Sequence, residues 1–571
     1  MSNIYDKASL VLIPSGTKTS KVYSQKPTNG DGDFTFSRST AATRVNASGN
    51  IEKETQNLFY QSNDFSSAYW NYRAGDSSTG GQSGYDGTND AWLLSVNSGG
   101  WAVYQNYVIT GVYTFSLYVK AGTIDVIQID LFSSSTTYSG QFNLTSGTDA
   151  GGGNTIDRTI TDVGGGWYRV SLAANVSSTL YARIGSVSVT GNFYIQDAQL
   201  EQGLVARDYI ETTTPVYGGI TDNTPRLDYT DSSCPALLLE PQRFNAIDSS
   251  EYGGAWAAIN ANITKTENAT TSPEGVNNAV KLEGLTTSSA NQIVNFGTTS
   301  LNGVNVVGKT YTASLYLKPV NAGDVGKDIV LSIQRNTGDF EGFNVTTEIT
   351  SADWKRYDLT YTFTGEGAGD QVGATFKILS PVSTTIDDIY IWGVQFEEGS
   401  YATSYIPTYG SAVTRNIDNM QIASGISDLL PQGTGTMYVA GTIVDAVDTE
   451  GYLMRIEQAS FSNTIFIARS TAGNLFVSYR DGNSTLFSMQ KNNVADTFKA
   501  AFAFESGNSV LYVNGEQVGT SSVTYTPSVT YDDIRIGGYS ANTANMSGLF
   551  SQGLVFKTRL SNEELATLTT I

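Results

Sequence analysis

The segment YIQDAQLEQGLVARDYIET at residues 194–212 returns as YIWGVQFEEGSYATSYIPT at residues 390–408. The two segments share Tyr, Ile, Gln, Glu, Gly, Ala and Thr at matching places. An earlier segment, YTFSLYVK at residues 113–120, returns as YTASLYLK at residues 311–318. Because both pairs occur in the same order, they predict one domain that is present twice in the chain.

The strand pattern of the chain supports this duplication. GTNDAWLL at residues 87–94 returns as GVNNAVKL at residues 275–282, and short runs of alternating apolar and polar residues follow in both copies. Period-two alternation rich in aromatic and β-branched residues is typical of half-buried strands. Helical periodicity is nearly absent; in SNEELATL at residues 561–568, Ser561 and Glu564 form a capping-box pattern. We therefore predict an all-β chain of tandem antiparallel β-sandwiches of the jelly-roll type, two of them duplicated.

The repeats and the breaks between them divide the chain into six expected parts. A joint rich in Pro, Asp and Thr separates the two copies, and a shorter joint follows the second copy. The expected parts are an N-terminal attachment segment (1–55), a first sandwich (56–213), a linker (214–235), a second sandwich (236–409), a linker (410–425) and a C-terminal jelly roll (426–571).

The composition excludes several classes of function. The 571 residues include 33 Lys and Arg against 54 Asp and Glu, which gives a net charge of −21, with no His and a single cysteine, Cys234. Without His there can be no Ser-His-Asp catalysis and no His-ligated metal, and one cysteine cannot form an intrachain disulfide. The acidic balance argues against a nucleic-acid partner. No apolar run is long enough to insert in a membrane, and no signal peptide is recognisable, so we expect synthesis in a cytosol without secretion.

Two motifs that could carry chemistry are better read as structural features. Residues 303–310, GVNVVGKT, fit the phosphate-loop pattern, but a strand follows where the motif needs a helix, so we predict a turn. Without His, acid–base catalysis would rest on carboxylate pairs such as Asp387–Asp388 and Glu397–Glu398. Solvation at edges and in loops accounts for these pairs, and we predict no catalytic residue.

The C-terminal part resembles a known family. FAFESGNSVLYVNGEQVG at residues 502–519, IRIGGYS at 534–540 and LFSQGLVFKTRLSNEELATL at 549–568 together resemble a laminin-G-like jelly roll of the concanavalin type. Asn514-Gly515 is also a strong hairpin signal. The two duplicated domains resemble the jelly rolls of carbohydrate-binding modules at the level of the fold.

The first 240 residues resemble tail or head fibre proteins of bacteriophages. The segments that carry the resemblance are ASLVLIPSGTKTSKVYSQKP at 8–27, FTFSRSTAATRVNASGNIE at 34–52, NLFYQSNDF at 57–65 and DAQLEQGLVARDYIETT at 197–213. The resemblance implies a structural protein at the virion surface, made in the host cytoplasm. It further implies attachment to other virion proteins through the N-terminus, a homo-oligomer, expected to be a trimer, and a free C-terminal jelly roll.

These resemblances imply display and recognition of a host-surface glycan without catalysis. Two alternatives stay open: a glycan-degrading fibre enzyme that uses carboxylates, and a bacterial carbohydrate-binding surface protein. Trp92 and Trp101 have no aromatic counterpart in the second copy, which makes them candidates for stacking on sugar rings. Tyr539, Asn542 and Asn545 lie in a polar and aromatic loop at the expected rim of the last domain and are further glycan candidates.

No cofactor is required by this interpretation, although calcium fits the acidic loops. Carboxylate oxygens are ligands that Ca²⁺ prefers, and the jelly rolls that the chain resembles often hold that ion. The candidate ligands are Asp197, Asp387, Asp388, Asp448 and Glu450.

Overall fold

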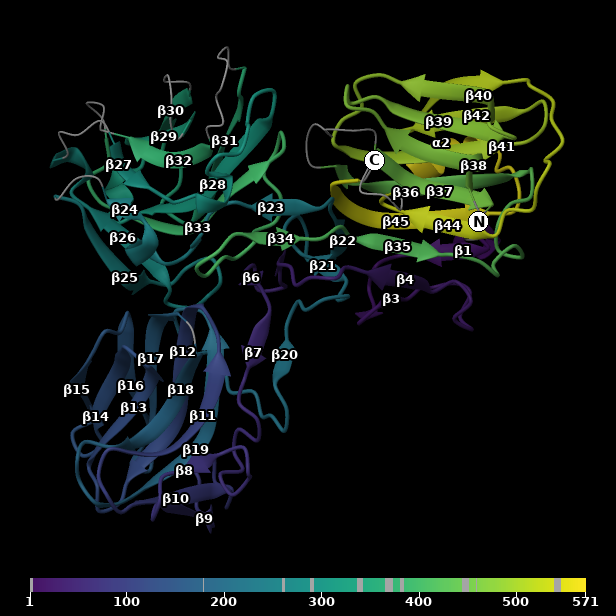
Figure 1. Ribbon diagram of the computed structural model, residues 1–571. Helices are drawn as coiled ribbons and strands as arrows, with labels where there is room; N and C mark the ends of the chain where they lie inside the picture. The colour runs from purple at the N-terminus through teal and green to yellow at the C-terminus, as the bar shows by residue number, and fades with distance from the viewer. Residues whose placement is uncertain are drawn as a thin grey trace.

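The computed structural model describes residues 4–177, 179–258, 262–287, 292–335, 342–364, 373–379, 385–443, 451–458, 460–538 and 546–571. Three β-sandwich lobes account for nearly all of its strands, and only two α-helices are described, α1 (Ile4–Lys7) and α2 (Asn562–Thr569). All strand pairs in the named sheets are antiparallel, and each lobe has its own apolar core (Figure 1). The prediction of an all-β chain of tandem sandwiches is confirmed.

The first sandwich consists of two six-stranded sheets. One sheet has the order β16 (Asp157–Gly164), β17 (Trp167–Val176), β12 (Gly111–Ala121), β19 (Gly191–Gln202), β10 (Ala91–Val96) and β9 (Ser77–Gln82). The facing sheet has the order β15 (Thr148–Gly153), β14 (Thr137–Asn143), β13 (Val126–Ser133), β18 (Thr179–Ser186), β11 (Trp101–Val108) and β8 (Asn71–Tyr72).

The second sandwich repeats this order with one strand fewer in each sheet. One sheet runs β31 (Lys355–Thr362), β28 (Thr310–Pro319), β33 (Ile389–Glu398), β26 (Ala279–Glu283) and β25 (Thr264–Thr270). The other runs β30 (Gly342–Glu348), β29 (Asp328–Arg335), β32 (Ala374–Leu379), β27 (Gln292–Asn295) and β24 (Ala257–Ala258). Every strand therefore has a counterpart with the same neighbours in the first sandwich, as a duplication requires.

Buried polar contacts are repeated together with the strands. The Asn57 side chain donates to the carbonyl oxygen of Ala198 over 3.0 Å, and the Asn245 side chain donates to the carbonyl oxygen of Val394 over 3.4 Å. Both asparagines are fully buried at the start of their sandwich. Such paired contacts show that the two copies share local geometry as well as strand order.

The C-terminal sandwich gathers strands from three distant parts of the chain. Its nine-stranded sheet joins β2 (Thr17–Lys18), β3 (Lys21–Val22), β4 (Phe34–Ser37), β35 (Asn419–Ile422), β44 (Asp533–Ile536), β37 (Gly451–Gln458), β38 (Ser460–Arg469), β39 (Leu475–Asp481) and β40 (Ser484–Lys491). The facing sheet joins β21 (Arg226–Asp228), β22 (Ala236–Leu239), β45 (Gly548–Phe556), β36 (Gly435–Ile443), β41 (Thr497–Phe504), β42 (Ser509–Val513) and β43 (Glu516–Ser521), with β1 (Leu10–Leu12) on β45 as well.

Residues 1–55, expected as a separate N-terminal attachment segment, include strands that belong to the C-terminal sandwich. Strand β1 pairs with β45, and Leu10 and Leu12 are fully buried in the C-terminal core. Strand β4 pairs with β35 of the same lobe. Apolar residues of this segment are covered by the last domain, which places both ends of the chain at one lobe (Figure 1).

The linker at 214–235 and the start of the second sandwich at 236 also need correction. Strand β20 (Val216–Gly218) pairs with β7 (Thr55–Asn57), and β21 pairs with β22. Strand β22 does not belong to the second sandwich; it pairs with β45, and its residues Leu237 and Leu239 lie in the C-terminal core. The short strands β23 (Arg243–Asn245) and β34 (Val413–Arg415) pair beside it.

Two local predictions for the C-terminal part are confirmed. Asn514 and Gly515 have φ of 52° and 82° and join β42 to β43, as expected of the hairpin. Ser561 accepts from the N–H of Glu564, whose carboxylate accepts from the N–H of Ser561, so helix α2 begins with the predicted capping box. A further short hairpin joins β5 (Arg44–Val45) to β6 (Ile51–Glu52) around Gly49.

A buried ionic network ties the parts of the chain together at the junction. Arg38 contacts Asp418 over 3.0 Å, and Arg226 contacts both Asp418 and Glu240. Arg415 also contacts Glu240, and none of these five side chains is more than 4% exposed. Charges buried this deeply need partners, so the network fixes the N-terminal segment, the linker and the joint at 410–425 relative to one another.

Candidate functional site

An aromatic face lies on the outside of one sheet of the first sandwich. On β13 the core residues Ile127, Ile129 and Leu131 alternate with outward residues, among them Phe132. Strand β18 likewise places Ala182 and Ile184 in the core and Tyr181 outside. Because successive side chains of a strand point to opposite faces, the outward residues of β11, β13 and β18 form one surface.

Four half-buried aromatic rings make up this surface, which we call the aromatic face: Trp101, Tyr104, Phe132 and Tyr181. The ring centroids of Trp101 and Tyr104 are 5.4 Å apart and those of Tyr104 and Tyr181 are 5.2 Å apart, both edge to face. The ring centroids of Phe132 and Tyr181 are 6.1 Å apart. The rings therefore form a continuous row across three neighbouring strands.

Charged and amide groups flank the row of rings. Arg183 lies 4.0 Å over the ring of Phe132 and contacts the Asp130 carboxylate over 2.5 Å. The Gln128 side chain donates to Asp130 over 3.0 Å, and Gln141 donates to Gln128 over 3.1 Å. Burial raises the pKa of Asp130 above its ordinary value, although its bond to Arg183 opposes this shift. The aromatic face thus combines apolar ring surfaces with adjacent donors and acceptors.

The second sandwich has no such row at the corresponding positions. By strand order and register, Tyr104, Phe132 and Tyr181 correspond to Asn295, Gln334 and Thr375. These residues bond with one another or with nearby polar groups: Thr375 donates to Asn295 over 2.8 Å, and Lys377 donates to Gln334 over 3.2 Å. The two copies therefore share a core and differ on this outer face.

Trp92 lies at one end of the first sandwich, away from the aromatic face. Its Nε1 donates to the carbonyl oxygen of Asn63 over 2.7 Å, and its ring packs on Gly80, where an added Cβ would come within 3.1 Å of the indole. Trp92 borders a pocket of about 250 Å³, which we call the Trp92 pocket. Its lining residues are Gln61, Asn63, Asp64, Gly81, Asp90, Trp92, Glu211, Thr212 and Thr213. The structure therefore separates the two tryptophan candidates into different sites.

Asp197, a calcium candidate, occupies a bulge in β19. Its φ of 55° is in the left-handed region, where its counterpart Gly393 has a φ of 64°. The carboxylate accepts from the Tyr85 hydroxyl over 3.0 Å. Burial raises the pKa of Asp197 to about 7, and the nearby charges of Asp90 and Asp86 add to this rise.

The remaining calcium and glycan candidates do not converge on one site. Asp387 accepts from Thr286, and Asp388 lies 3.7 Å from Lys281, both in the second sandwich. Asp448 and Glu450, like Tyr539, Asn542 and Asn545, lie outside the residues that the structure describes. Among the residues that it does describe, no three His, Cys, Asp or Glu side chains are grouped so that they could hold a metal ion.

The phosphate-loop pattern and the Glu397–Glu398 pair both have structural roles. Residue 310, the last of the phosphate-loop pattern, begins strand β28, as predicted for a turn that leads into a strand. The prediction that Glu397 is solvated is wrong, because its side chain is fully buried. The Glu397 carboxylate accepts from the backbone N–H of Thr403 over 2.8 Å and from the Thr403 hydroxyl over 2.7 Å. This carboxylate stabilises the turn after β33 and is occupied by that role.

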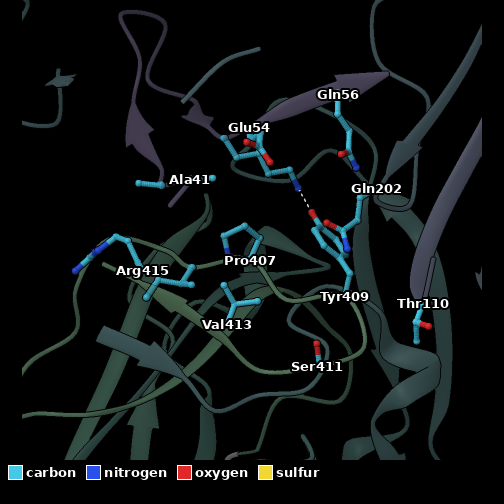
Figure 2. Close-up of a pocket in the computed structure, with 13 residues that line it drawn as sticks. Ala41, Glu54, Gln56, Thr110, Gln202, Pro407, Tyr409, Ser411, Val413 and Arg415 are labelled. Atoms are coloured by element: carbon cyan, nitrogen blue, oxygen red, sulfur yellow. Dashed lines mark hydrogen bonds between the residues drawn. The ribbon is translucent and has the colours of Figure 1, made fainter. Parts of the chain in front are cut away.

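A cavity of about 170 Å³ lies at the junction of the N-terminal segment with the two duplicated sandwiches. Figure 2 shows Glu54 and Gln56 on one side of it, with Pro407 and Tyr409 nearby. Burial raises the pKa of Glu54 to about 6, and the charge of Asp222 adds to this rise. Because several separate segments of the chain enclose the cavity, we interpret it as a packing gap and assign it no ligand.

Sequence reasoning identified Trp101 but missed the three other rings of the aromatic face. The available signal was the placement of Phe132 and Tyr181 at the outward positions of strands whose inward positions are Ile, Leu and Ala. No helix in the described part of the chain is long and apolar enough to cross a membrane. The cysteine, Cys234, is free and exposed.

Comparisons with known proteins concern parts of the chain. No curated protein matches it. Among solved structures, the Ruminococcus gnavus IT-sialidase CBM40 bound to alpha2,3 sialyllactose is similar at 16% identity, covering 27% of this chain and 96% of that one, with a TM-score of 0.23. The NanB sialidase from Streptococcus pneumoniae is similar at 19% identity, covering 26% of each chain, with a TM-score of 0.23. The binding domain of botulinum neurotoxin serotype D/C is similar at 13% identity, covering 27% of this chain and 40% of that one, with a TM-score of 0.24.

TM-scores this low support no argument about function. Residues 433–566 match the family described as the concanavalin A-like lectin/glucanases superfamily, which confirms the laminin-G-like resemblance of the C-terminal sandwich.

Proposed function

We propose that this protein recognises glycans, and that the aromatic face of the first sandwich is a binding surface for them. The observation that carries the proposal is the row formed by Trp101, Tyr104, Phe132 and Tyr181 beside the Arg183–Asp130 pair. Sugar rings present apolar C–H faces that stack on aromatic rings and hydroxyls that bond with charged and amide groups. The match of the C-terminal domain to a lectin and glucanase superfamily is consistent with this function.

We further propose that the protein is a display component of a bacteriophage particle, a tail or head fibre, without catalytic activity. The support is the resemblance of the first 240 residues to fibre proteins. Hydrolysis of a glycosidic bond uses two carboxyl groups, whereas the Asp130 carboxylate beside the aromatic face is paired with Arg183. Oligomerisation, as a trimer, would turn weak single-site contacts into useful avidity.

The proposal is tested by measuring the affinity of the full chain for an array of bacterial surface polysaccharides and defined oligosaccharides. The informative variant is Tyr181→Thr combined with Phe132→Gln, which installs the residues of the second sandwich at these positions. Stacking contacts worth about 1 kcal/mol each predict at least a tenfold loss of affinity for the double variant. Thr375→Ala, on the corresponding face of the second sandwich, is the matched control and should bind like the wild type.

Two results would contradict the proposal. If the double variant folds and binds every ligand as tightly as the wild type, then the aromatic face is not the binding surface. If purified protein releases new reducing ends from a polysaccharide that it binds, the non-catalytic assignment is wrong and the glycan-degrading alternative takes its place.

A further inference from the structure

One end of the second sandwich contains a buried lysine from outside that sandwich. The Lys53 ammonium group lies 2.9 Å from a Glu251 carboxylate oxygen and 2.9 Å from a Glu274 oxygen, and it donates to the Tyr409 hydroxyl. Its charge lies 5.1 Å from the centroid of the Tyr409 ring. Burial by itself lowers the pKa of Lys53, but the carboxylates of Glu251 and Glu274 more than offset this and raise it above its ordinary value. We call the site formed by Glu251, Glu274, Asn278 and Tyr409 the lysine socket.

The Trp92 pocket occupies the corresponding end of the first sandwich. Asn63 follows Ser62, whose backbone N–H donates to the carbonyl oxygen of Thr212 over 3.0 Å. In the same way, Glu251 follows Ser250, whose N–H donates to the carbonyl oxygen of Thr408 over 3.1 Å. The repeated segments at 87–94 and 275–282 match Asp90 with Asn278. One position beyond the repeats at 194–212 and 390–408, Thr213 corresponds to Tyr409. Three residues that line the Trp92 pocket are therefore counterparts of three residues of the lysine socket.

A carboxylate–amide pair is present at both ends with its members exchanged. In the lysine socket, the Asn278 side chain donates to Glu251 over 3.0 Å. In the Trp92 pocket, the Asn63 side chain donates to Asp90 over 3.1 Å. The two copies thus both keep one amide and one carboxylate in contact, with the negative charge after strand β23 in the second copy and just before strand β10 in the first.

The two sites differ in whether their charge is balanced. In the lysine socket, Lys53 pairs with Glu251 and Glu274, and Arg207 pairs with Glu274 over 2.5 Å. The Trp92 pocket is lined by Asp64, Asp90 and Glu211, and no Lys or Arg is among its lining residues. Three carboxylates therefore line the Trp92 pocket with no cation among its lining residues, whereas the carboxylates of the lysine socket are paired with Lys53 and Arg207.

Trp92 supplies an aromatic wall that suits the same ligand. Its counterpart is Val280, while in the lysine socket the ring beside the ammonium group belongs to Tyr409. A cation near an indole ring is attracted by the ring's quadrupole, most strongly among the aromatic side chains. One Asp90 oxygen already accepts from Thr88 and Gln196, and the other accepts from Asn63. Because each carboxylate oxygen can accept two hydrogen bonds, one place remains on the second oxygen. The Trp92 pocket thus presents both features that hold Lys53 in the other copy.

We propose that the Trp92 pocket binds the ammonium group of a lysine side chain supplied by a separate, basic partner protein, because the net charge of −21 disfavours contact between two copies of this chain. The lysine would enter between Asp90 and Trp92, as Lys53 enters between Glu251 and Tyr409. This inference is independent of the proposed glycan function, which rests on the aromatic face.

The test uses the full chain labelled with 5-fluorotryptophan, whose seven tryptophans are followed by fluorine NMR. Trp92→Phe identifies the Trp92 resonance. We expect Nα-acetyl-lysine methylamide to shift this resonance in a saturable way at millimolar concentration, and its Nε-acetylated analogue, which has no charge, to leave it in place. A neutral sugar such as lactose should also leave it in place.

Two variants separate charge recognition from a loss of folding. Asp90→Asn should weaken binding of the lysine compound at least fivefold. Adding Asn63→Glu to that variant recreates the arrangement of Glu251 and Asn278, and it should restore the affinity to within about twofold of the wild type. Asp353→Asn, at an exposed residue of the second sandwich, makes the same change in net charge and should have no effect.

Sedimentation of the unlabelled chain over a range of concentrations identifies the source of the lysine. A monomer that binds the lysine compound supports a separate partner protein, whereas self-association that Asp90→Asn abolishes would overturn this assignment in favour of a second copy. The proposal is overturned if the Trp92 resonance responds equally to the acetylated compound, responds only to the sugar, or does not respond at all. It is also overturned if the double variant folds and fails to recover binding.

Discussion

Replacing Lys53 by methionine should destabilise the second sandwich by about 4 kcal/mol. The methionine keeps most of the side-chain volume, but Glu251, which is fully buried, loses the one cation that it contacts among the described residues. Glu274 keeps its ion pair with Arg207 and the hydrogen bond that it accepts from Asn278. Breaking a buried ion pair from one side costs about 3 to 5 kcal/mol, because the remaining charge is left without compensation. In a domain of this size that loss lowers the melting temperature by about 8 to 16 °C.

Calorimetry at several pH values measures this effect and its cause. Burial raises the pKa of Glu274, but Lys53 and Arg207 outweigh burial and hold it below the ordinary value. A carboxyl with a lowered folded-state pKa stabilises the fold above its unfolded pKa, and this stabilisation is lost as the pH falls through the folded value. The cost of Lys53→Met should therefore be largest above pH 4.5 and shrink below it, and adding Glu251→Gln should recover most of it. A loss below about 1 kcal/mol at pH 7, or one that does not change with pH, would refute this account of the lysine socket.

Three further predictions concern other parts of the molecule. Asp197→Asn should stabilise the first sandwich by about 2 kcal/mol at pH 8 and by little below pH 4. The reason is that folding raises the pKa of the Asp197 carboxyl from 3.8 to about 7, so this carboxyl destabilises the folded state increasingly as the pH rises between these values. Urea unfolding at both pH values checks this, and equal effects at both would contradict it. Asp418→Asn should cost about 3 to 5 kcal/mol, since Arg38 and Arg226 stay buried with less negative charge, and limited proteolysis should then cut the junction faster than in the wild type. Leu12→Ala should cost about 2 to 4 kcal/mol in the unfolding of the C-terminal sandwich, and a change within error would show that strand β1 does not belong to that core.

Local patterns made the duplicated sandwiches predictable. The repeated segments name matching strands, and alternation within runs such as VIQIDLF at residues 126–132 separates inward Ile and Leu from outward residues. The hairpin at Asn514 and the capping box at Ser561 depend only on neighbours in sequence, so they too could be identified in advance. These features share one property: the residues that determine them are close together in the chain.

Contacts between distant segments could not be predicted in the same way. Arg38 and Asp418 are charged residues in polar stretches, and nothing near either one indicates that both are buried against each other. Lys53 likewise precedes the first sandwich, although its partners are in the second. The aromatic face was found only in part, because its rings come from three strands and each ring alone is an ordinary strand residue.

The pairing of β1 with β45 sets the order in which the chain can be completed during translation. Leu10 leaves the ribosome early, but its partner Val555 is made about 545 residues later, which at 5 to 20 residues per second is roughly half a minute to two minutes. Over that time both duplicated sandwiches can be synthesised in full, while the apolar side of β1 stays uncovered. A polypeptide released before strand β45 is made would present this uncovered strand to chaperones and proteases, so the late pairing distinguishes chains that include β45 from shorter ones.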